Sequence, residues 1–225
     1  MKIDWQNMSG GENTITLEGA AGKIESILHL PKAGIVESPI QAMMICCHPH
    51  PLYGGTMSNK IVHIICKTFS KMGLPTLRFN FRSIGESEGI HDNGIGESED
   101  LLILSELMHE TWPNRELWLA GFSFGSWIAA NTAVQAKAKQ LLSIAPPVQY
   151  FDFKDFNQPT CPWLVLMGDQ DDVVEPEKVY EWINAQQDNK PELIRFSEAG
   201  HFFHGEMVNM SNILEKHYHQ MLLEC

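Results

Sequence analysis

Five consecutive residues of this 225-residue chain, Gly121-Phe122-Ser123-Phe124-Gly125, place a hydroxyl nucleophile between two glycines. The short apolar run before them, 117–120, suits a buried strand, and the mostly apolar segment after them, 126–134, suits a helix. Because a strand that turns sharply into a helix brings its backbone close to itself, side chains two positions from the serine would clash. The pattern predicts a nucleophile elbow, with the Ser123 hydroxyl above a sheet and at the positive end of a helix.

Acidic residues and a histidine follow the serine in an order that suits serine catalysis. A strand-like run, 163–167, ends in a loop that contains Asp169, Asp171 and Asp172, and the strand candidate 192–196 precedes His201. In this chemistry the histidine accepts the serine proton, while a buried carboxylate fixes the imidazole tautomer and stabilises its cation. The chain order serine, aspartate, histidine is the one expected of an α/β-hydrolase.

Further stretches extend the similarity over most of the chain, from about residue 45 to about residue 205. They are Cys47-His48-Pro49-His50-Pro51-Leu52-Tyr53-Gly54-Gly55-Thr56-Met57, the run 78–89, the loop 168–174 and Ala199-Gly200-His201-Phe202-Phe203-His204-Gly205. With these motifs the chain resembles the α/β-hydrolase superfamily, and more narrowly the small, lidless hydrolases related to dienelactone hydrolase. The resemblance implies a mostly parallel central sheet flanked by helices on both faces, without a substantial lid.

The resemblance also assigns residues. It selects Asp171 as the acid beside Ser123 and His201, and leaves Asp169 and Asp172 as solvated or turn-forming residues. Dienelactone hydrolases use a cysteine nucleophile, whereas position 123 here is serine. This difference favours ordinary serine ester chemistry over lactone hydrolysis.

The expected activity is therefore hydrolysis of carboxylic esters with small to medium acyl groups, through an acyl-enzyme on Ser123. The same three residues could serve a thioesterase, an acyltransferase or a peptidase. A binding protein that has lost its chemistry is a further alternative, but such proteins usually lack part of the triad. We expect a small-molecule ester as partner and no cofactor.

An oxyanion hole needs two backbone N–H donors aimed at the developing negative charge. One donor is expected at Phe124, the residue after the nucleophile. The other should come from the loop after the strand candidate 42–47, where Pro49 and Pro51 have no N–H to give. His50 and Leu52 remain, and the position relative to the strand end favours His50.

Other polar residues allow competing interpretations. Imidazoles are common zinc ligands, so His48, His50, His201 and His204 could suggest a metal site. A ring-constrained proline separates the first two, and the triad already uses His201, so we expect no catalytic metal. Arg78 and Arg82, close in sequence to Glu86, Glu88 and Asp92, predict an ion-pair network around their loop or, alternatively, a surface that steers acidic substrates.

Composition narrows the possible partners. The formal net charge of −12 argues against nucleic acid or an anionic membrane surface as a partner. The chain has no apolar run long enough to span a membrane, and its first residues lack the apolar core of a signal peptide. Five cysteines, with Cys46 and Cys47 adjacent, are best explained as reduced thiols. We therefore expect a cytoplasmic protein, and the sequence leaves its oligomeric state open.

The remaining segments alternate between strand and helix patterns, as in an α/β fold with a single domain over residues 1–225. Strands are expected at 14–17, 23–30, 42–47, 74–79 and 140–145, and helices at 59–71, 97–110, 176–186 and 205–223. The segment 146–161 is too short for a helical lid and contains several prolines. The site should be open, with a rim of Tyr150, Phe151, Phe153 and Phe156 unless these rings pack the loop down instead.

Overall fold

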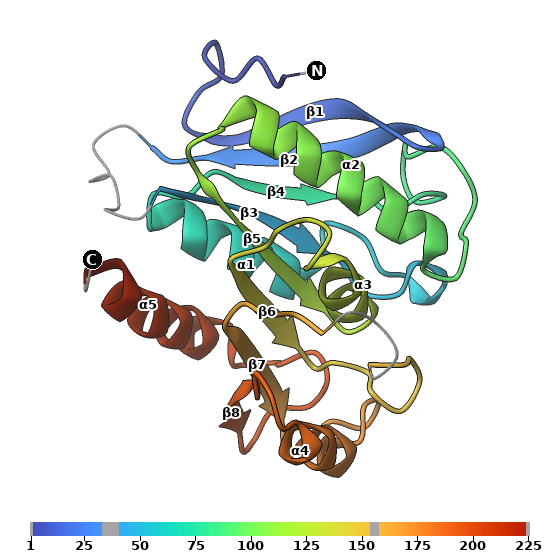
Figure 1. Ribbon diagram of the computed structural model, residues 1–225, viewed down its shortest axis with the longest axis vertical. Coiled ribbons are helices and arrows are strands. Elements are labelled where there is room, and N and C mark those ends of the chain that lie inside the picture. Colours follow the sequence, from blue (N-terminus) through green and yellow to red (C-terminus); the bar gives the residue numbers. More distant parts are fainter. Residues whose placement is uncertain (1, 33–40, 154–157, 224–225) are drawn as a thin grey trace.

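A computed structural model describes residues 2–32, 41–153 and 158–223. One eight-stranded sheet runs through the described chain in the order β1-β2-β4-β3-β5-β6-β7-β8 (Figure 1). The strands are β1 (Gly11–Gly19), β2 (Gly22–Leu30), β3 (Ala42–Cys47), β4 (Thr76–Phe79), β5 (Glu116–Phe122), β6 (Gln140–Ile144), β7 (Trp163–Gly168) and β8 (Glu192–Phe196). Within this sheet β2 runs antiparallel to both its neighbours, and the pairs from β4 to β8 are all parallel.

Helices cover both faces of the sheet. They are the short 3-10 helix η1 (Pro51–Tyr53), α1 (Lys60–Lys71), α2 (Ile95–Thr111), α3 (Phe124–Thr132), α4 (Pro176–Ala185) and α5 (Met207–Leu223). Helix α2 crosses in front of β1, β2 and β4 and packs against α3, while α1 passes behind the strands and packs against α5 (Figure 1). The predicted fold class, a mostly parallel sheet between two helical layers, is confirmed.

Local sequence explains where the elements begin and end. The Asn59 side chain accepts a hydrogen bond from the Ile61 N–H (2.9 Å) and so caps the start of α1. Strand β4 begins at Thr76, two residues later than predicted, because Pro75 has no N–H for the ladder. The carbonyl of Pro75 still accepts the Met44 N–H at 2.9 Å. Helix α2 begins at Ile95, two residues earlier than predicted, after Gly94 with its left-handed φ of +97°.

The core behind the sheet is built around large aromatic side chains from three elements. Phe69 of α1 packs edge-on against Trp118 of β5 and against Tyr218 of α5, with ring centroids 5.9 and 5.0 Å apart. All three side chains are fully buried. Burying a side chain of this kind contributes about 1.5–3 kcal/mol. This cluster therefore fixes the two rear helices against the central strand that leads to Ser123.

The parallel strands place their carboxyl ends at one edge of the sheet. The segments that follow β3, β5, β7 and β8 carry His50, Ser123, Asp171 and His201 in turn. None of the described helices is both long enough and apolar enough to span a lipid bilayer. The single domain over residues 1–225 stays a prediction.

Candidate active site

Ser123 lies in a one-residue turn between β5 and α3, at the carboxyl edge of the sheet. Its backbone has φ +51° and ψ −122°, a conformation that non-glycine residues rarely adopt. A side chain at Gly121 would overlap the carbonyl of Gly125, and one at Gly125 would overlap the carbonyl of Cys47 on β3. The strand, turn and helix predicted around the serine are therefore present, and both glycines are sterically required.

His201 and Asp171 form a buried pair close to this turn. The His201 Nδ1–H donates to Asp171 Oδ2 at 2.8 Å, and the two residues are only 5% and 8% exposed. The other carboxylate oxygen, Oδ1, accepts the N–H groups of Val173 (2.9 Å) and Val174 (2.7 Å). Because the carboxylate holds a proton on Nδ1, the Nε2 atom of His201 is left as a proton acceptor.

Phe122 connects this pair to the serine. Its ring lies 4.9 Å from the imidazole of His201, centroid to centroid, and Phe122 directly precedes Ser123 in the chain. Ser123 itself is half-buried. Within the described part of the chain, no hydrogen bond joins the Ser123 hydroxyl to His201. The structure thus brings all three predicted residues to one edge and bonds two of them to each other.

The two neighbouring aspartates have other surroundings. Asp169 is held by Arg195 at 2.9 Å through both carboxylate oxygens, and its Oδ1 also accepts the hydroxyl of Tyr180. The Arg195 guanidinium lowers the pKa of Asp169. Asp169 lies in the turn that follows β7, as one of the two expectations had it, but its side chain is paired with residues of α4 and β8. Asp172 is exposed, as expected.

Two backbone N–H groups near the serine lack acceptors among the described residues. The Phe124 N–H is at the first position of α3, where an intrahelical acceptor does not exist. The His50 N–H donates to no described acceptor, whereas the Leu52 N–H donates to Nδ1 of the His50 ring at 3.2 Å. The two rings lie 4.7 Å apart, so His50 and Phe124 are in contact. Of the two loop candidates, only His50 keeps its N–H available.

His48 has a structural position and does not resemble a metal ligand. Its Nδ1 lies 2.6 Å from the carbonyl of Pro49, and its Nε2 accepts the Phe81 N–H at 2.9 Å. Burial lowers the pKa of His48 to about 3. His204 is exposed and contacts the Phe202 ring. Across residues 2–32, 41–153 and 158–223, no group of three or more histidine, cysteine or acidic side chains could hold a metal ion.

The predicted ion-pair network of Arg78 and Arg82 with Glu86, Glu88 and Asp92 is wrong. Arg78 instead reaches Glu12 on β1 at 3.1 Å, and Arg82 pairs with Asp100 on α2 at 2.9 Å. Both partners are supplied by elements that lie far away in sequence. Of the nearby acids, Glu88 instead accepts the Lys23 N–H at 2.9 Å, and Asp92 accepts the Gly96 N–H at 3.2 Å.

The aromatic residues between β6 and β7 divide into exposed and packed ones. Tyr150 is 66% exposed, as expected of a rim residue. Phe151 stacks on Trp127 of α3, with centroids 4.7 Å apart, and the buried Phe153 packs against Trp182 of α4. Phe156 lies outside the described residues. The part of this loop up to residue 153 therefore packs against α3 and α4 through two of its rings.

Sequence reasoning missed two polar residues beside the site, His91 and Glu97. The sequence predicts Glu97 only as the first residue of a helix. An acidic residue in the first turn of a helix, shortly after a histidine, is the signal that could have found them.

Comparison with known proteins supports the same family. No protein-family model matches the chain. A solved structure from Xanthomonas campestris, described as an α/β serine hydrolase without a lid, is 35% identical, covers 96% of this chain and 97% of its own, and superposes with a TM-score of 0.89. An α/β serine hydrolase homologue from Coxiella burnetii is 40% identical over 94% of this chain and 99% of its own, with a TM-score of 0.85.

An uncharacterized protein of Rickettsia prowazekii is 34% identical over 198 residues, which cover 84% of this chain and 81% of that protein. The descriptions of the solved relatives support a hydrolase. Their similarity extends over nearly the whole sheet and both helical layers. The chain belongs to the α/β-hydrolase superfamily, among its members without a lid.

Proposed function

We propose that this protein is a serine hydrolase that cleaves carboxylic esters through an acyl-enzyme on Ser123. The observation that carries the proposal is the 2.8 Å hydrogen bond from His201 to Asp171, next to the turn that holds the serine. A histidine oriented by a buried carboxylate is the general base that a serine nucleophile needs. The relatives described as serine hydrolases support this assignment.

In the first half of the reaction, Nε2 of His201 accepts the proton of the Ser123 hydroxyl as Oγ attacks the ester carbonyl carbon. The negative charge that develops on the carbonyl oxygen is stabilised by the N–H groups of Phe124 and His50. The amino end of α3 adds the favourable end of the helix dipole. The carbonyl re-forms as the C–O bond to the alcohol breaks, and His201 delivers its proton to the departing alcohol oxygen.

In the second half, a water molecule gives a proton to His201 Nε2 and attacks the acyl carbon bound to Ser123 Oγ. Collapse of this second tetrahedral intermediate breaks the bond to Oγ, which takes the proton back from His201. The products are a carboxylic acid and the original serine. Asp171 stays ionised throughout and stabilises the imidazolium that forms twice in each cycle.

Membership among hydrolases without a lid supports esters of small to medium acyl groups as substrates. In the described part of the loop between β6 and β7, Phe151 packs against α3 and Phe153 packs against α4. A cytoplasmic location is also a proposal, and it is supported by four free, buried cysteines among the described residues. Those four are Cys46, Cys47, Cys66 and Cys161.

The experiment that tests the proposal compares Ser123→Ala with the wild type in the hydrolysis of p-nitrophenyl acetate. The rate constant kcat should fall by at least about 10³-fold, because removal of the nucleophile leaves only binding and oxyanion stabilisation. Ser197→Ala, at an exposed serine after β8, should keep full activity. Circular dichroism should be the same for all three proteins. Undiminished turnover by folded Ser123→Ala would exclude the proposed nucleophile.

A further inference from the structure

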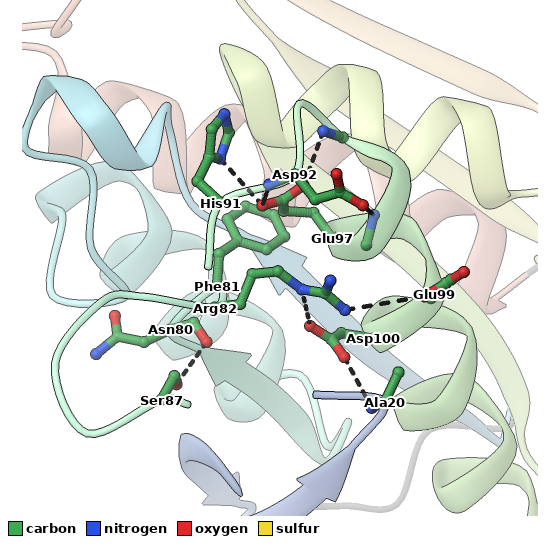
Figure 2. Close-up of polar contacts among 12 residues, drawn as sticks. Ala20, Asn80, Phe81, Arg82, Ser87, His91, Asp92, Glu97, Glu99 and Asp100 are labelled. Atoms are coloured by element: carbon green, nitrogen blue, oxygen red, sulfur yellow. Dashed lines mark hydrogen bonds and ion pairs between the residues drawn. The ribbon is translucent and has the colours of Figure 1, made fainter. Parts of the chain in front are cut away.

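A second buried pair of a carboxylate and an imidazole lies near the proposed oxyanion site. Glu97, in the first turn of α2, is fully buried, and its Oε1 lies 3.0 Å from Nδ1 of His91 (Figure 2). The same carboxylate accepts the N–H groups of Asp92 (3.0 Å) and Gly94 (2.7 Å). The contact with Glu97 lacks hydrogen-bond geometry, and the buried Nδ1 atom of His91 has no hydrogen-bond partner among the described residues.

The loop that carries His91 is fixed at several points. Arg82 pairs with Asp100 of α2 at 2.9 Å, and Asp100 also accepts the Ala20 N–H at 2.9 Å (Figure 2). The hydroxyl of Ser87 donates to the carbonyl of Asn80 at 2.8 Å. Anchors at both ends of the loop, with Glu97 beneath it, leave His91 little freedom to move. The imidazole is accordingly only 9% exposed.

His91 packs against the two residues to which the oxyanion donors are assigned. Its ring lies 5.2 Å from the ring of His50 and 6.0 Å from that of Phe124. His201, in contrast, packs against Phe122. Each pair of acid and imidazole therefore contacts a sequence neighbour of Ser123. His201 contacts Phe122, the residue before the serine, and His91 contacts Phe124, the residue after it.

We propose that His91, oriented by Glu97, is a positioning residue for the oxyanion site. By packing against the ring of His50, it holds that ring on Phe124 and keeps the His50 N–H beside the Phe124 N–H. The inference rests on the proposed chemistry of Ser123 and adds a role that this chemistry does not assign. Because negative charge on the carbonyl oxygen develops in the transition state, loss of this positioning should lower kcat.

A purely structural role for Glu97 makes a different prediction. If its carboxylate only caps α2 and His91 only fills space, substitutions should lower stability and leave the kinetic constants of the folded protein unchanged. The two interpretations are therefore separated by kcat and KM measured on folded protein, with the melting temperature recorded in parallel.

The test uses three changes, His91→Phe, His91→Ala and Glu97→Gln, with p-nitrophenyl acetate as substrate. His91→Ala should lower kcat about 10-fold with KM within about 2-fold, since misalignment of an oxyanion donor costs less than its complete loss, about 10²–10³-fold. Glu97→Gln should lower kcat in the same direction. The double variant His91→Phe with Glu97→Gln should lose no more than the larger single effect, because the two residues act as a unit.

Matched controls are Glu106→Gln, at an exposed residue on the same helix, and His109→Phe, near the other end of α2. Both should retain wild-type kcat. If His91→Ala does not fold, His91→Phe carries the kinetic comparison. It keeps a ring against His50 but has no nitrogen for Glu97 to orient, so kcat should fall, although by less than expected for His91→Ala. Wild-type kcat in folded His91→Phe and Glu97→Gln would overturn the positioning role while leaving the chemistry of Ser123 intact. An inactive wild type would instead remove the proposed function, and the positioning role with it.

Discussion

At the scale of single residues, the site depends on which atoms carry protons. Asp171 receives one hydrogen bond from His201 and two from backbone N–H groups, so both its oxygens are occupied by donors. A carboxylate that accepts the Nδ1–H of the imidazole can fix the tautomer of that ring. The competing Asp169 is committed to Arg195 and Tyr180. The surroundings of the two acids therefore favour Asp171, as the family resemblance implied.

Replacing that carboxylate by an amide tests this choice. Asp171→Asn should lower kcat for p-nitrophenyl acetate by about 10³–10⁴-fold, because the amide no longer stabilises the imidazolium and allows the wrong tautomer. Asp172→Asn, at the exposed neighbour, should change kcat by less than about 2-fold if its side chain is only solvated. Equal losses for the two variants would contradict the assignment.

Because His48 is buried, we expect the free energy of unfolding to depend on pH. Burial lowers its pKa in the folded protein from 6.5 to about 3, so the unfolded chain binds this proton more readily than the folded one. The stabilisation is complete above about pH 6.5 and is lost as the pH falls toward 3, at about 1.4 kcal/mol for each pH unit.

Urea unfolding at pH 7 and pH 5 measures this effect. His48 alone should make the wild type about 2 kcal/mol less stable at pH 5 than at pH 7. The variant His48→Gln removes the titrating group and should show a correspondingly smaller difference. An equal difference in the two proteins would show that the imidazole is not protected in the folded state.

At the scale of elements, the serine turn depends on contact between neighbouring backbones. Gly125 at the start of α3 lies directly against the end of β3, where a side chain would overlap the carbonyl of Cys47. Because β3 is the neighbour of β5 in the sheet, this contact fixes the height of α3 above the sheet and with it the position of Ser123. The strained φ of Ser123 is maintained by this packing.

Gly125→Ala should therefore destabilise the protein by more than about 3 kcal/mol and lower its activity, because the backbone of Cys47 and His48 must move. Gly54→Ala is a suitable comparison, since Gly54 has a left-handed φ, +80°, but its added Cβ meets no atom within 4 Å. Gly54→Ala should lower the free energy of unfolding by about 1 kcal/mol, which is the cost of the backbone strain alone. Thermal or urea unfolding measures the stability of both variants, and similar losses of stability would contradict the steric explanation.

Periodic patterns of apolar residues predicted most of the helices and strands, because each such pattern is formed by residues within the helix or strand itself. In the helix predicted at 97–110, Leu101, Leu104 and Met108 recur at helical spacing, and all three side chains are buried in α2. What the sequence did not predict depends on elements that meet only after folding. The partners of Arg78 and Arg82 come from β1 and α2, and the contact between His91 and His50 joins two different loops. No short-range pattern specifies such pairings.

At the scale of the whole molecule, exposed apolar side chains concentrate at the carboxyl edge of the sheet. Ten large apolar residues of the described chain are exposed, and eight of them lie in segments that follow the carboxyl ends of strands. The eight are Leu52, Tyr53, Ile90, Ile95, Tyr150, Val173, Phe202 and Val208. Because the candidate active site is at the same edge, an apolar part of a substrate would meet these side chains.

Ester chain length tests this arrangement. KM should fall from p-nitrophenyl acetate to the butyrate and hexanoate, by at most about 4-fold for each methylene that becomes fully buried and by less in an open site. Tyr53→Ser should raise KM for the hexanoate more than for the acetate. Val134→Ser, at an exposed residue just after α3 and outside this group, should change neither. A KM independent of chain length would show that these side chains do not contact the substrate.

The central claim is that Ser123 is a nucleophile activated by His201, and covalent labelling measures this most directly. The wild-type protein, treated with a fluorophosphonate probe and digested, should show by mass spectrometry one adduct, on the peptide that contains Ser123. His201→Ala should label far more slowly, and Ser123→Ala should not label at all. A folded wild-type protein that takes up no probe, or takes it up at a different serine, would contradict the account.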